Sequence, residues 1–227
     1  MKKKTIAVFF ICALFVVMAS GAAAPTEEPK DALLETALGR IEDDTYINEY
    51  YGVGMTLPED WSFFTDEELA EMMNISSKLI KDEELSELMT QSMDESGAVT
   101  NMAAKDKLGT HNVNMRLNRM PNAMMLAMEE KDILKILSET VTDRLERAGY
   151  TDLEIEIGEI TFAGETKAAM FLSGKYLNIP IYQAEILLME KEYYAVLTFT
   201  SMLEDELDGT IEPWFSLEED AERTKTA

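Results

Sequence analysis

The chain has 227 residues, of which 44 are acidic and 20 are basic, so its formal net charge at pH 7 is −24. A body this negative would be repelled by nucleic acid and by anionic membrane surfaces, which argues against both as partners. Cys12 is the only cysteine, so the chain cannot form a disulfide framework of its own.

The first 24 residues have the pattern of a secretory signal peptide. Lys2, Lys3 and Lys4 precede an apolar run from Ile6 to Met18, and small residues follow it up to Ala24. Signal peptidase accepts such small residues, and the apolar run is shorter than the roughly 20 residues of a bilayer span. We therefore expect cleavage here and a secreted or extracytoplasmic protein of the cell envelope, with an uncleaved anchor as the alternative. The cleaved chain would have no cysteine.

The rest of the chain divides by composition into a linker, one domain and a tail. Residues 25–45 are acidic and carry only a weak amphipathic pattern without a helix stop signal, which predicts a linker. Residues 46–217 are enough for a single domain with a substantial core. Residues 218–227 are polar and predict a C-terminal tail.

The stretch from Tyr46 to Leu69 predicts a strand, a turn, a second short strand and a helix start. Apolar residues alternate up to Leu57, and Pro58 ends the strand in a β-turn over residues 57–60. The chain then returns through Trp61, which we expect to anchor the core, and Gly52 and Pro58 shape the unit.

Thr65 and Glu68 have the spacing of a capping box, in which each side chain satisfies the other residue's backbone N–H. Phe64 before the cap and Leu69 within the helix match a hydrophobic staple. This motif predicts that a helix begins at Asp66.

Two short helices starting at Asp66 and Asp82 are predicted next, and Gly97 ends the second. Segments 99–104 and 111–117 flank a glycine-containing turn and predict a hairpin. Polar and apolar residues alternate from His111 to Leu117, so we expect one side of this strand to face water.

A long amphipathic helix is predicted from the four-residue spacing of Ile133, Leu137, Val141 and Leu145. Gly149 is placed to close it in the left-handed conformation. An aliphatic stripe of this length indicates that the helix covers a sheet.

From Thr151 onward the apolar period changes to two, and four successive strands with short links predict an antiparallel meander. The alternation changes phase at Gly158, which suggests a bulge there. Residues 186–189 are apolar on both faces, so their strand should be interior. A last acidic helix is expected to end near Trp214 and Phe215, with these aromatics packed on the sheet.

Together these elements predict an α+β fold class in which a single antiparallel sheet of about six to seven strands is flanked by helices. The run from Tyr50 to Trp61, the strand at Asn112–Asn114, and Tyr193–Ser201 with its acidic continuation resemble the PsbP-like family. The resemblance implies an α/β/α sandwich, shared by the PsbP subunit of photosystem II and a Ran-binding nuclear import factor and used mostly as an adaptor. The pattern YxNxYxGxxxxLPxxW is also similar to secreted proteins of Gram-positive bacteria, and it contains no catalytic residue.

Candidate chemical groups are few in type. His111 is the only histidine, and the cleaved chain would have no cysteine, which excludes a catalytic Cys–His pair and argues against a zinc site. A solvated turn residue is the favoured interpretation of His111. Acidic clusters offer weak binding of divalent cations, but none has the spacing of a dedicated calcium loop, so solvated acidic faces are favoured. These clusters are Asp43–Asp44, residues 204–208 and residues 218–220.

Ten of the sixteen methionines lie between Met72 and Met128. Met124, Met125 and Met128 form a candidate partner surface for a hydrophobic ligand or protein, in one cluster with Met72, Met73, Met89 and Met93. Packing in the core is the favoured interpretation, and a Cu(I) thioether site is a further alternative.

The sequence therefore predicts an exported, non-catalytic binding or interaction module without a cofactor, whose partner is a protein or a hydrophobic ligand. An extracytoplasmic hydrolase is the alternative. It would require two carboxylates that converge in a cleft, one of them with a raised pKa.

Overall fold

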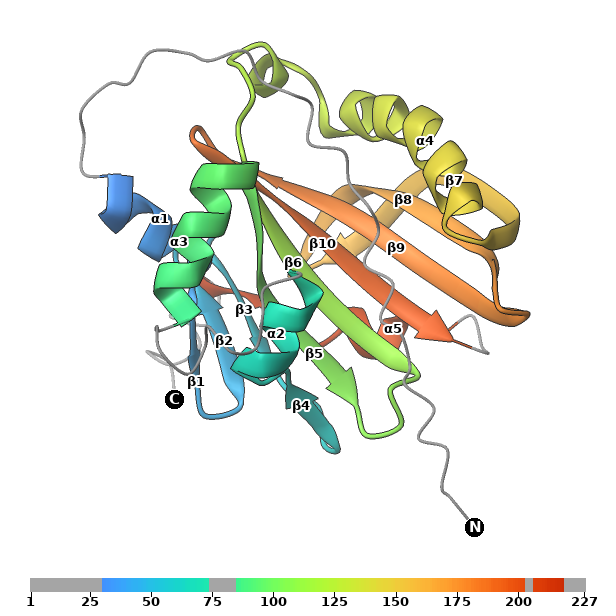
Figure 1. Ribbon diagram of the computed structural model, residues 1–227, viewed down its shortest axis with the longest axis horizontal. Coiled ribbons are helices and arrows are strands. Elements are labelled where there is room, and N and C mark those ends of the chain that lie inside the picture. The colour runs from blue at the N-terminus through green and yellow to red at the C-terminus, as the bar shows by residue number, and fades with distance from the viewer. Residues whose placement is uncertain (1–29, 74–84, 203–205, 219–227) are drawn as a thin grey trace.

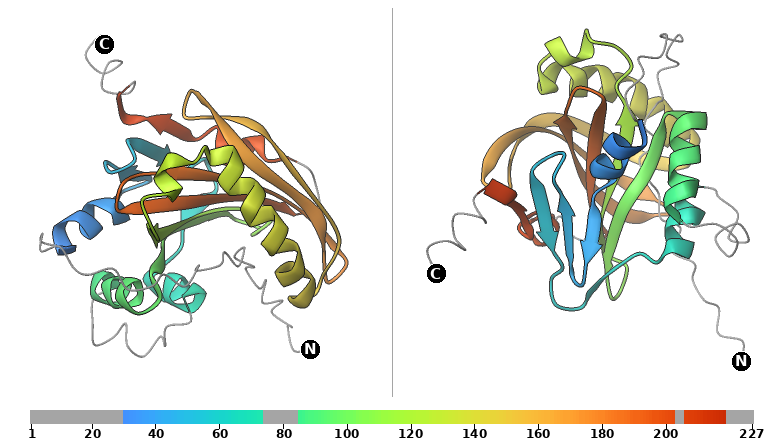
Figure 2. Two further views of the ribbon diagram at one scale, coloured as in Figure 1. Left: turned by 90° about the horizontal axis from the view of Figure 1, so that it is seen from above. Right: turned by 90° about the vertical axis from the view of Figure 1, so that its left-hand side faces the viewer.

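A computed structural model describes residues 30–73, 85–202 and 206–218. Figures 1 and 2 show three layers: a large antiparallel sheet, helices on one of its faces, and a small sheet on the other. The α+β class predicted from the sequence is confirmed. The predicted signal peptide and most of the predicted tail lie outside the described residues.

The large sheet has seven antiparallel strands in the order β4-β5-β6-β10-β9-β8-β7. The strands are β4 (Trp61–Phe63), β5 (Ala98–Asp106), β6 (His111–Arg119), β7 (Tyr150–Phe162), β8 (Glu165–Tyr176), β9 (Ile179–Met189) and β10 (Tyr193–Met202). The predicted hairpin is β5–β6 and the predicted meander is β7 to β10, and both are confirmed. Strand β9 lies inside the sheet, as its two apolar faces indicate.

The small sheet is an addition that the sequence did not predict. Its strands, in the order β1-β2-β3-β11, are β1 (Arg40–Glu42), β2 (Thr45–Asn48), β3 (Val53–Thr56) and β11 (Trp214–Ser216). Trp214 and Phe215 lie on this last strand, opposite Met55 and Gly54, so the prediction that they end a helix is wrong. The helix before them is only α5 (Asp208–Ile211).

Three apolar clusters hold the layers together. The inter-sheet core lies between the two sheets and includes Tyr46, Met55, Phe199 and Trp214. The α4 core lies between α4 (Glu130–Arg147) and strands β7 to β10, and the predicted stripe residues Ile133, Val141 and Leu145 are buried in it. The α2–α3 core packs α2 (Asp66–Met72) and α3 (Leu85–Ser96) against β5.

Part of the predicted linker is packed against the domain. Residues 30–38 form α1 (Lys30–Leu38), whose Leu34 and Ala37 are buried in the α2–α3 core. The Tyr46 hydroxyl donates a hydrogen bond of 3.0 Å to the carbonyl of Leu38 and accepts one of 2.9 Å from the Asn101 amide. Asn101 lies at the register shift within β5 and has no cross-strand partner in β6. Its amide also donates to the Leu38 carbonyl, so it connects the large sheet to the end of α1.

The opening unit of the domain differs from its prediction in two details. The turn is closed by a hydrogen bond of 3.1 Å from the Trp61 amide to the Pro58 carbonyl, one residue later than expected. Trp61 lies on the edge strand β4 and is only partly buried, so it is not a core anchor. Gly52 has a φ of +67°, a conformation that L side chains rarely adopt.

The capping box is confirmed. The Glu68 amide donates to the Thr65 hydroxyl at 3.3 Å, and the Thr65 amide donates to the Glu68 carboxylate at 3.0 Å. Partial burial acts to raise the pKa of Glu68, but hydrogen bonds from Lys105 and Thr65 outweigh it and lower the pKa below its usual value. The cap therefore also joins α2 to β5.

We expect Thr65→Ala to lower the free energy of unfolding by about 0.5–2 kcal/mol, because the first turn of α2 loses its acceptor. Urea unfolding followed by circular dichroism measures this change. Thr65→Ser keeps the hydroxyl and should restore most of the loss. Identical midpoints for Thr65→Ala and the natural chain would show that the box contributes nothing.

Two further strand predictions are wrong. The register of β7 with β8 runs without interruption from Glu154 to Phe162, so Gly158 is not a bulge. The apolar phase changes because Ile155 and Ile157 pack on the α4 core, whereas Ile160 and Phe162 pack on the opposite, inter-sheet core. In β6, the face expected to contact solvent is buried, as the burial of its asparagines Asn112, Asn114 and Asn118 shows.

Candidate functional site

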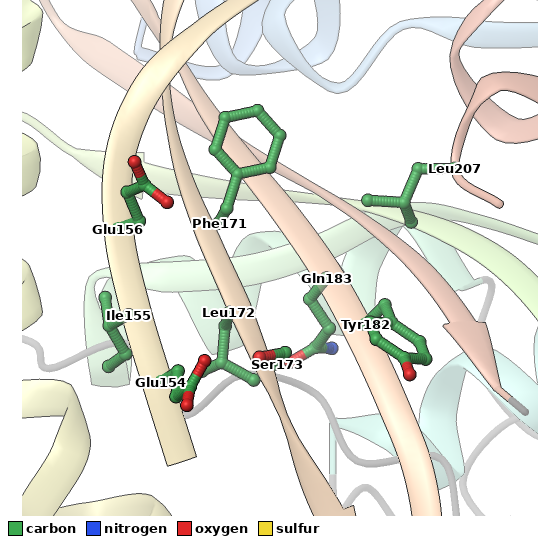
Figure 3. Close-up of a pocket in the computed structure, with 9 residues that line it drawn as sticks. All are labelled: Glu154, Ile155, Glu156, Phe171, Leu172, Ser173, Tyr182, Gln183 and Leu207. Carbon is green, nitrogen blue, oxygen red and sulfur yellow. The ribbon is translucent and has the colours of Figure 1, made fainter. Parts of the chain in front are cut away.

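The large sheet forms an open hollow of about 520 Å³ at its β7 end, on the face that bears the small sheet. Figure 3 shows its lining, which comes from three adjacent strands and the segment before α5. Side chains in register on one face are Glu154 and Glu156 of β7, Phe171 and Ser173 of β8, and Tyr182 of β9. Leu207 lines the hollow from outside the sheet.

The hollow begins where the inter-sheet core ends. Phe171 and Leu207 pack against that core and are only partly buried. Beyond them Ser173 and Tyr182 lie on the same face, and both side chains are partly open to solvent. The hollow therefore has an apolar, aromatic inner wall and a polar outer end.

The β7 side of the hollow is acidic and has no described counter-charge. Glu154 and Glu156 are both exposed, and they lie two residues apart on one face of the strand. Their neighbour Asp152 forms an ion pair of 2.7 Å with Lys175. Among the ion pairs of the described residues, none involves Glu154 or Glu156, so both carboxylates can receive a cationic group.

His111 lies away from this hollow, at the start of β6. Its Nδ1 is 3.1 Å from Asp106 and 3.2 Å from the Thr110 hydroxyl, which itself donates to Asp106 at 2.7 Å. A nucleophile activated by histidine must give its proton to the ring nitrogen that the carboxylate does not hold. Here Thr110 and Asp106 both contact the same nitrogen, so the group closes the hairpin and is not arranged as a catalytic triad.

Glu185 of β9 is a feature that the sequence reading missed. It is 2% exposed, one of its carboxyl oxygens has no hydrogen-bond partner, and burial raises its pKa to about 8. Its cross-strand neighbours are Met170 and Thr198, on the helix-covered face. An acidic residue inside the apolar run from Ala184 to Met189 is the sequence signal that could have revealed it.

Among the described residues, the carboxyl group with the most strongly raised pKa does not converge with the carboxylates of the hollow. The carboxyl group with the strongly raised pKa, Glu185, lies on the opposite face of the sheet from Glu154 and Glu156. Burial is the one cause of its shift, so no second carboxylate acts on it. The raised pKa is therefore a property of a buried residue outside the hollow.

The predicted cation sites receive no structural support. Asp43 and Asp44 are exposed in the turn between β1 and β2, and much of the two later acidic clusters lies outside the described residues. Within the described ranges, no group of three or more histidine, cysteine or acidic side chains could hold a metal ion. An acidic surface does lie between α1 and α3, lined by Glu35, Glu87, Asp94 and Glu95.

The methionines separate into two groups. Met89 and Met93 are buried in the α2–α3 core, with Met72 and Met73 at its margin, whereas Met125 and Met128 pack at the margin of the α4 core. The single predicted cluster is therefore wrong. Of the candidate surface, only Met124 is strongly exposed, at 72%. These residues precede α4 in the short 3₁₀ helix η2 (Met125–Ala127) and its caps, where the Asn122 side chain accepts from the Met124 amide at 3.0 Å.

In the parts of the chain that the structure describes, no helix combines the length and the apolar run required to cross a bilayer.

Comparison with known proteins finds a likeness only among solved structures. No family model and no curated protein matches the chain. Among solved structures, the chain is similar to cyanobacterial PsbP (CyanoP) from Synechocystis sp. PCC 6803, with 10% sequence identity and a TM-score of 0.42. The match covers 76% of this chain and 91% of that one. The resemblances to the PsbP-like family and to Gram-positive secreted proteins stay predictions.

Proposed function

We propose that this protein is a non-catalytic binding module, acting outside the cytoplasm after signal-peptide cleavage, and that it binds a positively charged ligand in the β7 hollow. The observation that supports this proposal is the pair of exposed carboxylates, Glu154 and Glu156, beside an aromatic wall. A ligand that carries both cationic and apolar groups complements such a surface.

Each part of the hollow contributes a different interaction. Lysine or arginine side chains of the ligand would pair with the two glutamates, and apolar or cationic groups would contact the faces of Phe171 and Tyr182. The net charge, −24 for the whole chain and −27 without the three lysines of the signal peptide, adds a long-range attraction that speeds the encounter at low salt. No covalent step is required for this role.

We expect the double variant Glu154→Gln and Glu156→Gln to bind cationic peptides about 5- to 30-fold more weakly, because two exposed charge pairs are each worth up to about 1 kcal/mol. Fluorescence anisotropy with a panel of labelled lysine–tyrosine peptides, and their glutamate counterparts, measures this loss. Raising the salt concentration should weaken binding by the natural protein more than by the variant.

The matched control removes two exposed carboxylates elsewhere, by Glu139→Gln and Glu146→Gln on α4. It has the same net charge as the test variant and should keep almost all of the affinity. Equal losses in the two variants would mean that overall charge, and not the hollow, attracts the peptide. No binding of any cationic peptide would contradict the proposed function itself.

A further inference from the structure

We propose that the ligand is an extended chain segment that pairs with the free edge of β7 as an eighth strand of the large sheet. This inference rests on the proposed function, because it specifies the kind of ligand that reaches Glu154 and Glu156. The partner would be an extended peptide segment in which basic residues alternate with apolar ones.

Strand β7 offers a long unpaired edge. It runs over 13 residues, from Tyr150 to Phe162, and it pairs with β8 on one side. It is the last strand of the sheet, so its other side has no partner strand among the described residues. Six of its residues are exposed: Thr151, Asp152, Glu154, Glu156, Glu159 and Thr161. Backbone N–H and C=O groups along such an edge are available to an added strand.

The charge of this edge selects among possible occupants. If a second copy of the chain paired with β7, its glutamates would lie beside Glu154, Glu156 and Glu159, and like charges in adjacent strands destabilise a sheet. Natural edges commonly avoid self-association in this way. A strand with lysine or arginine at the facing positions would instead be attracted, so the edge rejects copies of itself while it accepts a cationic segment.

The two faces of β7 define the sequence pattern of the added strand. Glu154 and Glu156 lie on the hollow side, so the residues beside them should be basic. Ile155 and Ile157 lie on the other side, only partly buried where β7 packs on the α4 core. Valine or isoleucine beside them would extend that core, since side chains alternate between faces along a strand.

Backbone methylation of a peptide tests the pairing directly. The probe is a lysine–valine alternating peptide of roughly nine residues, long enough to match most of a strand. Successive N–H groups of a strand point to opposite edges, so methylating the valine nitrogens blocks one edge and methylating the lysine nitrogens blocks the other. One methylated form should lose about tenfold or more in affinity, and the other should keep it.

The outcomes separate this inference from the proposed function. Selective loss with one methylated form, together with weaker binding to Glu154→Gln and Glu156→Gln, supports an added strand. Equal binding of both methylated forms overturns the added strand, while dependence on the two glutamates would still support the hollow. If a peptide of the same composition with its lysines grouped together binds as tightly as the alternating one, the alternation is also wrong. If none of the peptides binds, both the added strand and the proposed function are contradicted.

Discussion

Replacement of Glu185 by glutamine is expected to stabilise the protein by several kcal/mol above pH 8 and to change its stability little below about pH 4.5. The carboxyl group is buried, and its pKa rises from 4.5 to about 8 on folding. Between these two values the folded chain binds a proton that the unfolded chain releases, so the free energy of unfolding falls as the pH rises. One pKa unit corresponds to about 1.4 kcal/mol, which sets an upper bound of about 5 kcal/mol.

Glutamine has nearly the shape of the protonated acid and cannot ionise, so the variant should lose this pH dependence. Urea unfolding at a series of pH values from 4 to 9 measures the slopes of the two proteins. Glu146→Gln, at an exposed position on α4, is the matched control and should keep the slope of the natural chain. Parallel pH profiles for Glu185→Gln and the natural chain would mean that Glu185 is not protonated in the folded state near neutral pH.

Truncation of Trp214 to alanine is expected to cost about 3–5 kcal/mol, the range for a large aromatic side chain that leaves a cavity in a core. Trp214 is 4% exposed, and its ring lies 5.3 Å from that of Phe162 and 6.4 Å from that of Phe199, measured between centroids. These neighbours belong to the large sheet, so the indole joins the two sheets. Denaturant unfolding of the variant measures the loss.

The second tryptophan provides the control. Trp61→Ala should cost about 1–2 kcal/mol, because Trp61 lies at an edge strand and is only partly buried. Trp214→Phe should cost less than Trp214→Ala, since the buried indole N–H has no hydrogen-bond partner to lose. A larger loss for Trp61→Ala than for Trp214→Ala would reverse the assignment of the core anchor.

The elements that could be predicted from the sequence are those whose signals are local. The capping box at Thr65 and Glu68 involves residues three positions apart, and the stripe of α4 repeats every four residues. The meander from β7 to β10 follows from period-two alternation with short links. In each case the partner in space is also near in sequence.

What could not be predicted depends on distant contacts. The pairing of Trp214 with Met55 leaves no pattern in either segment, so the sequence predicts a helix at these aromatics. The face of β6 that carries Asn112 and Asn114 is buried, although its sequence predicts contact with water. Polar alternation does not distinguish solvent from buried polar neighbours. The hollow itself requires the register of three strands, and Glu154 and Glu156 are by themselves ordinary surface glutamates.

The pairing of β3 with β11 also makes folding depend on how much of the chain has been synthesised. Residues 53–56 leave the ribosome long before residues 214–216, so the small sheet and the inter-sheet core stay incomplete until nearly the whole described chain is available. A chain that ends before Trp214 would expose the apolar surface that this strand covers, including Phe162 and Phe199. Such a fragment would be open to proteases and chaperones, so a complete small sheet shows that synthesis has passed residue 216.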